Sequence, residues 1–321
     1  MSDIEVVGLG AMNVDQLYRV ERILADGEGL VKESSLLPGG SAANTIYALA
    51  RLGVKAGFVG TVGDDGEGEM LLRDFEAAGV DISQVRAKGG VKTGSVLCLS
   101  DSLSNRALYV SPGANNLLVA EDIDLEYINR TQVLHISSFA GEEQLGMQID
   151  LVNKLSPQVK VSFSPGALYA ARGLPALASL MRRAYILFVN RDEVEQLTGE
   201  DFMAGARVCL ERGCNIVVVT LGEGMMLDEA KVIACYIADG KNEYTVESRQ
   251  TVVGPMDTTG AGDAFVAGFI LGLLKGKKLE ECGTLGDIMA SFSLAGIGAR
   301  EKLPSLSELT ARYYKPYHSS L

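Results

Sequence analysis

The chain has 321 residues, of which 47% are hydrophobic and 37 are glycine, and it contains no tryptophan. That length and composition are typical of one large α/β domain with many tight turns between strands and helices. The formal net charge of −12 argues against nucleic acid and anionic membrane as partners, because the surface as a whole repels phosphate groups.

The cysteines and the N-terminus bear on the location of the protein. The five cysteines are scattered and form no Cys-x-x-Cys pair, which argues against a disulfide framework and against a zinc site. The first ten residues are acidic and strand-like, unlike a signal peptide. The longest apolar stretch, residues 264–274, is too short to span a membrane. The sequence therefore predicts a cytoplasmic protein.

Short apolar runs rich in Val and Ile alternate with helical patterns along the chain. The runs are at residues 4–7, 56–59, 133–136, 159–163, 186–189 and 216–219. Helical patterns cover 41–52 and 67–78, and each stops at a glycine. Strands that are apolar on both faces and alternate with helices are typical of a parallel sheet between two helical layers. We therefore expect a three-layer α/β/α fold with a mostly parallel sheet.

Two stretches break this alternation. Residues 16–37 and 93–110 have a half-polar, strand-like pattern without an intervening helix. They predict a small antiparallel sheet, inserted at about 14–38 and 92–112 into a single domain that covers residues 1–321. A small sheet beside a ligand crevice can act as a lid. Its edges and one face need covering, so a homodimer through the lid sheet is an open alternative.

The segment with the most chemical information is Asp257-Thr-Thr-Gly-Ala-Gly-Asp263, which leads directly into an apolar helix. Three small residues at the start of a helix leave backbone N–H groups uncovered, and the helix dipole adds positive charge there. This predicts an anion site with the Asp263 carboxylate beside it. A carboxylate there does not help anion binding, but it can accept a proton from an attacking hydroxyl group. The alternative is a helix-capping Asp after a glycine turn.

The same segment resembles the C-terminal signature of the ribokinase (PfkB-type) family of carbohydrate kinases. Three further segments are similar to motifs of that family and occur in the family's order. They are Gly39-Gly40-Ser-Ala-Ala-Asn44, Asn190-Arg-Asp-Glu193 and Val219-Thr220-Leu-Gly222. The resemblance implies a ribokinase-like fold and an enzyme that transfers a phosphoryl group from ATP to a hydroxyl group of a small sugar or sugar derivative.

The resemblance also implies a role for individual residues. Asp263 would be the base, and Gly260, Ala261 and Gly262 would form the anion hole. ATP would contact Asn190, Thr220, Gly222 and Thr258. Glu193 would orient Mg²⁺ through water. Asn13, Asp15, Gly39, Gly40, Asn44 and Ser138 would hold the acceptor. Asp257 would border a K⁺ site, although residues 299–304 depart from the Gly- and Ala-rich pattern usual there.

Other functions have weaker support from the residues. The segment from Gly8 to Asn13 lacks the third glycine of a dinucleotide-binding fingerprint, and no helical pattern follows it. No Gly-x4-Gly-Lys phosphate loop occurs in the sequence. Asn190 and Glu193 could simply cap a helix, and Asn13 and Asp15 could form a turn. A nucleotide or sugar sensor without turnover is the non-enzymatic alternative, but binding alone needs neither a base nor a metal organiser.

The acceptor is not determined by the sequence. Ser41, Ser138 and Ser164 occupy positions where ribokinase or many of its relatives carry other polar residues, which argues against ribose and leaves other sugars and nucleosides open. A nucleoside base needs a flat apolar surface. Phe139, Tyr109 and Tyr169 could provide it, or could pack in the core or the lid. Arg106 could meet an anionic acceptor such as a sugar phosphate.

Overall fold

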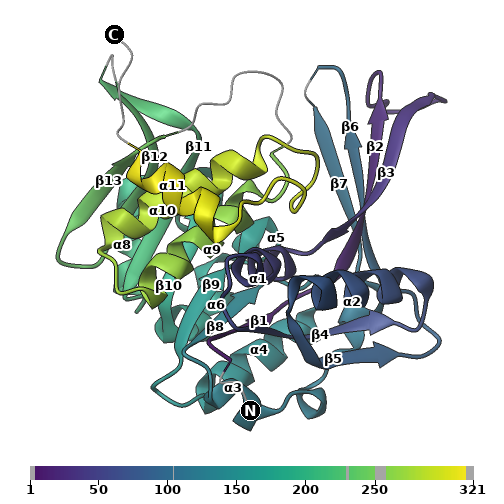
Figure 1. Cartoon of the computed structure of the whole chain (residues 1–321), viewed down its shortest axis with the longest axis horizontal. Coiled ribbons are helices and arrows are strands. Elements are labelled where there is room, and N and C mark those ends of the chain that lie inside the picture. Colours follow the sequence, from purple (N-terminus) through teal and green to yellow (C-terminus); the bar gives the residue numbers. More distant parts are fainter. Residues whose placement is uncertain (1–3, 104, 229–230, 250–257, 316–321) are drawn as a thin grey trace.

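The structure is a computed structural model that describes residues 4–103, 105–228, 231–249 and 258–315. It contains two sheets (Figure 1). The larger sheet has nine strands in the order β13-β12-β11-β10-β9-β8-β1-β4-β5, and the smaller has four in the order β3-β2-β6-β7. Among the described residues, no helix is long and apolar enough to cross a membrane.

The large sheet is parallel from β5 to β11, and β12 and β13 extend it antiparallel at one edge. Its strands are β1 (Val6–Leu9), β4 (Ala56–Gly63), β5 (Asp81–Lys88), β8 (Val133–Ser137), β9 (Lys160–Ser164), β10 (Ala184–Asn190), β11 (Ile216–Asp228), β12 (Lys231–Ala238) and β13 (Glu243–Glu247). The mostly parallel sheet expected from the apolar runs is confirmed, whereas β5, β12 and β13 are strands that the sequence pattern did not reveal.

Helices cover both faces of the large sheet, and the residues of each strand alternate between two cores. Val6 and Phe58 contribute to one core, and their neighbours Val7 and Val59 contribute to the other. The first core is shared with α1 (Ser41–Arg51), α2 (Gly66–Ala78), α9 (Ala261–Leu274), α10 (Leu279–Ser293) and α11 (Leu306–Tyr314). The second core is covered by α3 (Leu125–Asn129), α4 (Glu142–Lys154), α5 (Gly166–Ala170), α6 (Gly173–Arg183), α7 (Arg191–Thr198) and α8 (Phe202–Glu211). Strands that are apolar on both faces therefore require the three layers.

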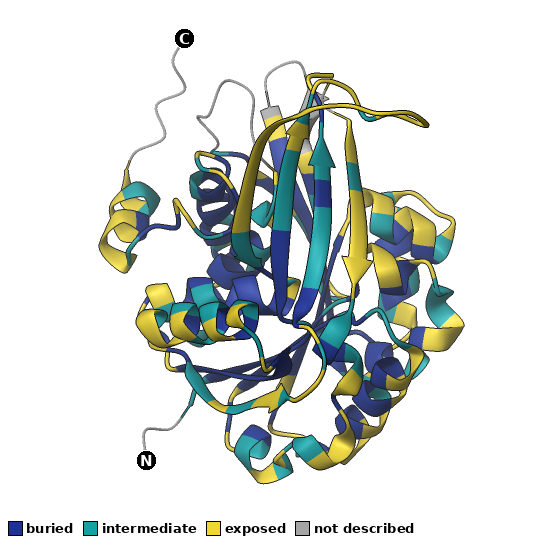
Figure 2. Cartoon of the chain, turned by 90° about the vertical axis from the view of Figure 1, so that its right-hand side faces the viewer, coloured by how far each residue is buried: buried dark blue, intermediate teal, exposed yellow. Residues whose placement is uncertain are grey.

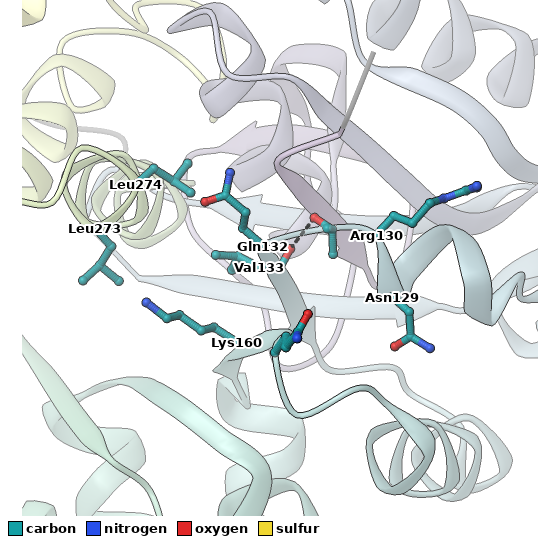
Figure 3. Close-up of a pocket in the computed structure, with 9 residues that line it drawn as sticks. Asn129, Arg130, Gln132, Val133, Lys160, Leu273 and Leu274 are labelled. Carbon is teal, nitrogen blue, oxygen red and sulfur yellow. Dashed lines mark hydrogen bonds between the residues drawn. The ribbon is translucent and has the colours of Figure 1, made fainter. Parts of the chain in front are cut away.

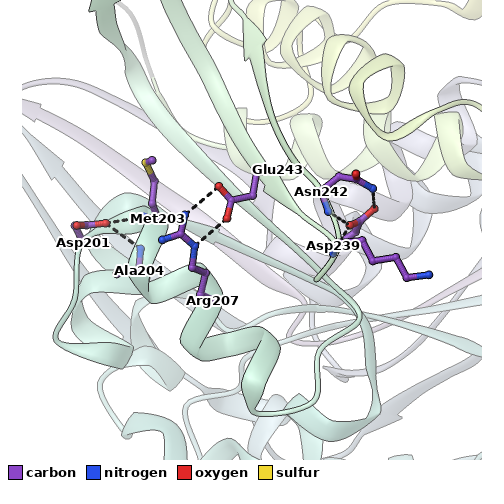
Figure 4. A network of polar contacts seen from close by, with 8 residues as sticks. Asp201, Met203, Ala204, Arg207, Asp239, Asn242 and Glu243 are labelled. Atoms are coloured by element: carbon purple, nitrogen blue, oxygen red, sulfur yellow. Dashed lines mark hydrogen bonds and ion pairs between the residues drawn. The ribbon is translucent and has the colours of Figure 1, made fainter.

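The antiparallel edge is joined to the second helical layer by polar contacts. Arg207 of α8 donates to both carboxylate oxygens of Glu243 at 2.8 and 3.0 Å, as Figure 4 shows. Asp239 accepts from the backbone N–H groups of Lys241 and Asn242, which closes the turn between β12 and β13. These bonds lie away from the segments that carry the candidate chemistry.

The small sheet consists of β2 (Asn13–Val20), β3 (Val31–Gly39), β6 (Gly94–Ser100) and β7 (Arg106–Ser111), in the two stretches where the sequence predicts it. Its outer pairs are antiparallel, and the central pair of β2 and β6 is parallel. Figure 2 shows that most of its residues are exposed or half-buried, and apart from Cys98 in β6 its buried residues lie near the large sheet. Asn13 begins a strand, so the segment after β1 does not enter the helix that a dinucleotide fingerprint requires.

All five cysteine side chains are buried. Cys98 lies in the small sheet. The other four are buried in the large sheet and its helical layers, and they are Cys209, Cys214, Cys235 and Cys282.

Candidate active site

The carboxyl ends of the parallel strands gather most of the residues selected from the sequence. The chain enters β2 after β1, Ser138 follows β8, and Asn190 at the end of β10 pairs with Thr220, where the parallel pairing of β10 with β11 ends. In open parallel sheets ligands bind in the crevice outside these ends. The candidate site therefore lies at this edge, where the small sheet also joins the large one (Figure 1).

The N-terminus of α9 has an open backbone. Gly260 adopts a left-handed conformation with φ of 76°, and a Cβ atom there would lie 2.2 Å from the Cβ of Ala299. Only glycine fits this turn. Within the described part of the chain, no side chain caps the helix, and Gly262 has open space where a side chain would stand. The Ala261 N–H donates to the carbonyl oxygen of Thr258 at 3.3 Å, and the other N–H groups of the first turn are thus available to an anion.

Asp263 lies in the first turn of α9 and is held by α1. The Ser41 hydroxyl donates to its Oδ1 at 2.7 Å, and the Asn44 Nδ2 donates to its Oδ2 at 2.9 Å. The Thr45 hydroxyl donates to its backbone carbonyl at 3.3 Å. Three side chains of one helix therefore fix the carboxylate beside the open N-terminus of another.

The surroundings of Asp263 adjust its acidity. Burial raises its pKa to about 7, opposed by the hydrogen bonds from Asn44 and Ser41. The negative charge of Asp15 raises the pKa further, and the positive charge of Arg300 lowers it. A carboxyl group whose pKa is near neutral suits proton transfer at physiological pH.

The residues proposed for the acceptor surround the root of the small sheet. Asp15 and Asn13 lie in β2, paired with Leu37 and Gly39 of β3. A Cβ atom on Gly39 would lie 2.3 Å from Oδ1 of Asp15, so glycine lets the chain approach this carboxylate closely. Gly40 has a φ of 99°, and a Cβ there would lie 2.2 Å from the carbonyl oxygen of Ala11.

Asn13 has a buried polar partner that sequence reasoning missed. Asn115 donates to the Asn13 Oδ1 at 2.9 Å and also bonds both backbone groups of Met12. Both asparagine side chains are buried. Asn115 therefore fixes which end of the Asn13 amide faces the acceptor side, because its own NH₂ group occupies the Asn13 oxygen.

The aromatic residues considered as a surface for a nucleoside base have different environments. Phe139 is buried in the core. Tyr169 is also buried there and donates to Gln148 at 2.9 Å. Tyr109 on β7 is 63% exposed. Of the three, only Tyr109 remains accessible to a ligand. Ser138 is half-buried after β8 and lies within reach of the turn at Gly166.

Asn190 and Glu193 form a reciprocal cap at the start of α7. The Asn190 Oδ1 accepts the N–H of Glu193 at 2.8 Å, and the Glu193 Oε2 accepts the N–H of Asn190 at 3.0 Å. The capping role weighed from the sequence is therefore present. Burial raises the pKa of Glu193. Thr220 lies on the neighbouring strand, and Gly222 follows with a φ of 65°.

An arginine of the small sheet reaches the anion site. Arg106 on β7 donates to the hydroxyl oxygen of Thr258 at 2.7 Å and to that of Thr259 at 2.8 Å. These threonines directly precede the glycine turn of α9. Asp257, expected beside a K⁺ site, lies outside the described residues. The sequence suggests Arg106 as a contact of an anionic acceptor, but nothing local to it indicates a contact with Thr258, 152 residues away.

A cavity of about 500 Å³ lies at the opposite edge of the sheet, at the amino ends of β8 and β9. Figure 3 shows that Arg130, Lys160, Leu273 and Leu274 line it. It contains none of the residues selected from the sequence, so we place the site by its chemistry at the carboxyl edge. Across residues 4–315, apart from the undescribed segments, no group of three or more His, Cys, Asp or Glu side chains could hold a metal ion.

The chain is similar to known proteins along most of its length. The model of the pfkB family of carbohydrate kinases matches residues 3–306. An uncharacterized sugar kinase of Archaeoglobus fulgidus is 41% identical over 261 residues, covering 80% of this chain and 98% of the relative. An ATP-dependent ribose-1-phosphate kinase of Halopiger xanaduensis is 30% identical, covering 92% of this chain and 94% of the relative.

Solved structures show the same fold. The Arabidopsis thaliana ribokinase complexed with ribose and ATP superposes with a TM-score of 0.84 at 24% identity, covering 97% of this chain and 99% of that structure. The ribokinase-like three-layer fold expected from the sequence is therefore confirmed.

Proposed function

The chain belongs to the pfkB family of carbohydrate kinases, and we propose that Asp263 is the base of its reaction. The reaction is ATP-dependent phosphoryl transfer to a hydroxyl group of a small sugar or sugar derivative. The observation that supports this role is the position of the carboxylate, held by Ser41 and Asn44 beside the open N-terminus of α9.

Asp263 can still accept a proton while it is held. Each carboxylate oxygen has two lone pairs, so the bonds from Ser41 and Asn44 leave capacity for an incoming hydroxyl group. With a pKa of about 7, a substantial fraction of Asp263 is ionised at neutral pH. Removing the hydroxyl proton makes the acceptor oxygen a better nucleophile as it approaches the phosphoryl group.

The transferred phosphoryl group would lie at the N-terminus of α9. There the amides of Gly260, Ala261 and Gly262 would stabilise negative charge, a contribution that is usually the largest in such reactions. Asn190, Thr220, Gly222 and Thr258 are the residues proposed for the nucleotide, at the end of β10, within β11 and before α9. ATP as the donor is consistent with a cytoplasmic location.

Glu193 fits a role in holding Mg²⁺. It is a half-buried carboxylate with a pKa raised by burial, and one oxygen is oriented by the Asn190 N–H. Mg²⁺ prefers oxygen ligands and keeps several waters, so a single carboxylate acting through water suffices. The ion would neutralise charge on the phosphates. A K⁺ site beside Asp257 is a further proposal, tested by replacing K⁺ with a bulky organic cation, which should lower activity.

The acceptor would bind between the small sheet and α1. Asn13, Asp15, Asn44 and Ser138 offer both donors and acceptors for sugar hydroxyl groups, and Gly39 and Gly40 allow close approach of the backbone. A nucleoside can present the same hydroxyl groups through its ribose, and a nucleoside kinase of Methanothermobacter thermautotrophicus is 26% identical to this chain. Nucleosides therefore remain an alternative acceptor class.

A phosphorylated sugar is a second candidate acceptor. Arg106 is an exposed arginine that now bonds two neutral threonine hydroxyl groups at the anion site. A guanidinium group binds phosphate more strongly than neutral hydroxyl groups. An acceptor phosphate could therefore replace the threonines, and a relative is named as a ribose-1-phosphate kinase.

The outer residues of the small sheet are the proposed contacts of a homodimer. Leu36 of β3 and Tyr109 of β7 lie on the face opposite to Arg106 and are 54% and 63% exposed. Burying such side chains against a second copy would remove apolar surface from water. Size-exclusion chromatography with light scattering tests this, and a monomer at micromolar concentration would contradict it.

The test of the function is ADP formation with a panel of sugars, sugar phosphates and nucleosides. We expect Asp263→Asn to lower kcat by about 10²- to 10⁴-fold, the usual contribution of a positioned base. Asp239→Asn is the matched control because Asp239 closes a turn at the far edge of the sheet. Wild-type turnover by Asp263→Asn would contradict the base assignment, and no ADP formation by wild type with any acceptor would support the sensor alternative.

A further inference from the structure

Arg300 is a buried arginine behind the candidate active site. It follows α10, in a segment that departs from the family's usual pattern, and its side chain is only 7% exposed. A buried guanidinium group is costly unless its donors are paired. The partners of Arg300 therefore indicate what it does.

The guanidinium group joins three segments of the chain. Its Nε donates to Oδ1 of Asn44 on α1 at 2.9 Å, and its Nη1 pairs with the carboxylate of Asp74 on α2. Its Nη2 approaches the carbonyl oxygen of Gly39, at the root of the small sheet, at 3.4 Å. The ring centroids of Tyr47 and Phe75 lie 4.9 and 5.3 Å from the guanidinium carbon. These contacts fix the group in one orientation.

The bond to Asn44 determines which way its amide faces. Arginine has donors and no acceptor, so the Asn44 atom that meets Nε must be the carbonyl oxygen. The NH₂ group of Asn44 then points to Oδ2 of Asp263 at 2.9 Å. The reversed amide would place an NH₂ group against Arg300 and an oxygen against the carboxylate, losing two hydrogen bonds and bringing like partial charges together.

We propose that Arg300 is a positioning residue for the base: it holds the Asn44 amide in the orientation that donates to Asp263. The proposal rests on the proposed function, since it assigns a role relative to the Asp263 base. Asp74 keeps the guanidinium group in place from the other side. A purely structural arginine would instead connect α1 to α2 without affecting the reaction.

The charges that face Asp263 determine how this role can be measured. Asp15 from β2 raises the pKa of Asp263, whereas Arg300 from the segment after α10 lowers it, as do the hydrogen bonds from α1. On the side of the small sheet, Arg106 reaches Thr258 and Thr259 before α9. Loss of Arg300 removes one cation and destabilises the Asn44 bond. Both changes favour the protonated carboxyl group, which cannot act as a base.

The experiment is the pH dependence of kcat for Arg300→Met in the full chain, using the panel compound with the highest wild-type turnover. In wild type, kcat should fall as pH drops through the pKa of Asp263, about 7. In Arg300→Met this fall should move to higher pH. The loss of kcat should be about 10-fold or more near pH 6 and smaller near pH 9, within the range for acid–base positioning.

Arg183→Met is the matched control. Arg183 is a half-buried arginine, and it donates to the backbone carbonyls of Ser156 and Val159 at 2.7 and 3.0 Å, away from the site. We expect this variant to lose stability while keeping the wild-type pH profile. An Arg300→Met profile with the wild-type midpoint and only a lower melting temperature would overturn the proposal.

A double-mutant cycle with Asn44→Ala tests the route of the effect. If Arg300 acts through Asn44, Arg300→Met should lower kcat much less in the Asn44→Ala background than in wild type. Equal losses in both backgrounds would overturn the proposal. If Arg300→Met shows no cooperative melting, kcat is measured for Arg300→Lys instead. Lysine keeps the positive charge but lacks the Nε–H donor and the planar guanidinium group. Wild-type kcat in Arg300→Lys would then overturn it.

These results are distinguishable from a failure of the proposed function. Wild-type turnover in Asp263→Asn would contradict the assignment of Asp263 as the base. By contrast, if Asp263→Asn is inactive and Arg300→Met keeps the wild-type pH profile, only the proposed role of Arg300 is contradicted.

Discussion

The large sheet and the small sheet differ in what covers their faces. Every residue of β4 is buried between two helical layers, whereas six of the nine residues of β3 are exposed. Burial of apolar surface is the main stabilising term in folding, so the large sheet contributes most of the stability. The small sheet is held chiefly by its ladder of backbone bonds and by its buried root. We therefore expect stability and ligand handling to respond to different substitutions.

The largest expected effect on stability comes from α9 beneath the site. Phe269 is fully buried and packs edge-on against Phe188, with ring centroids 5.2 Å apart. Phe269→Ala should lower the free energy of unfolding by about 3–5 kcal/mol, the usual cost of such a cavity. Urea denaturation measures this. A loss below about 1 kcal/mol would mean that the core can collapse around the missing ring.

The second-largest effect is expected at the junction of the two sheets. Gly40→Ala places a Cβ atom 2.2 Å from the Ala11 carbonyl oxygen, at a φ of 99° that other residues rarely adopt. We expect a loss of about 1–3 kcal/mol in stability, typical of local backbone strain, together with a large loss of kcat/KM. Gly66→Ala is the control, since its Cβ would meet nothing within 4 Å. Equal kcat/KM values for the two variants would contradict a role of this junction in acceptor binding.

A smaller effect should appear in the pH dependence of stability. The pKa of Asp263 is raised from 3.8 to about 7 on folding, so the folded chain keeps the proton that the unfolded chain loses as pH rises from 4 to 7. Wild type should therefore lose stability over this window relative to Asp263→Asn, which does not titrate. The difference in melting temperature should grow by a few degrees from pH 4 to pH 8.

Differential scanning fluorimetry at matched ionic strength measures this difference. A constant offset between Asp263→Asn and wild type across the pH range would contradict the raised pKa. The sign is informative, because a carboxylate stabilised by folding would make wild type relatively more stable as pH rises.

The smallest effect is expected on the outer surface of the small sheet. Leu36 on β3 is 54% exposed, so Leu36→Ser removes little buried area and should change the free energy of unfolding of the monomer by about 0.5 kcal/mol or less. Chemical denaturation at low protein concentration checks this. A loss near that of Phe269→Ala would show that the small sheet is buried in solution, as in the proposed homodimer.

Much of the fold could be predicted because its signals are local. Apolar runs separated by helical patterns indicated the parallel strands, and seven consecutive residues at the glycine-rich turn before α9 indicated the proposed anion site. The strands at the sheet edge were harder to predict. β5 has half-exposed and exposed residues along its length, so it lacks the continuous apolar pattern of the central strands.

The side-chain network around Asp263 could not be predicted from sequence patterns. Ser41 and Asp263 are 222 residues apart, and Arg300 and Asn44 are 256 apart. Ser41 stood out only as a departure from the ribokinase pattern, and the structure places it on the carboxylate. No rule of spacing links such distant polar residues, because their contact depends on how α1, α9 and the segment after α10 pack together.

The burial of all five cysteines has a practical consequence for studying the small sheet. Burial raises the thiol pKa of Cys209 and Cys282 to about 12, so these groups carry almost no reactive thiolate at neutral pH. A cysteine introduced at exposed Leu36 should therefore react selectively with a maleimide dye while the native thiols are left in place. Fluorescence from that single label would report directly whether the small sheet closes when nucleotide and sugar are added.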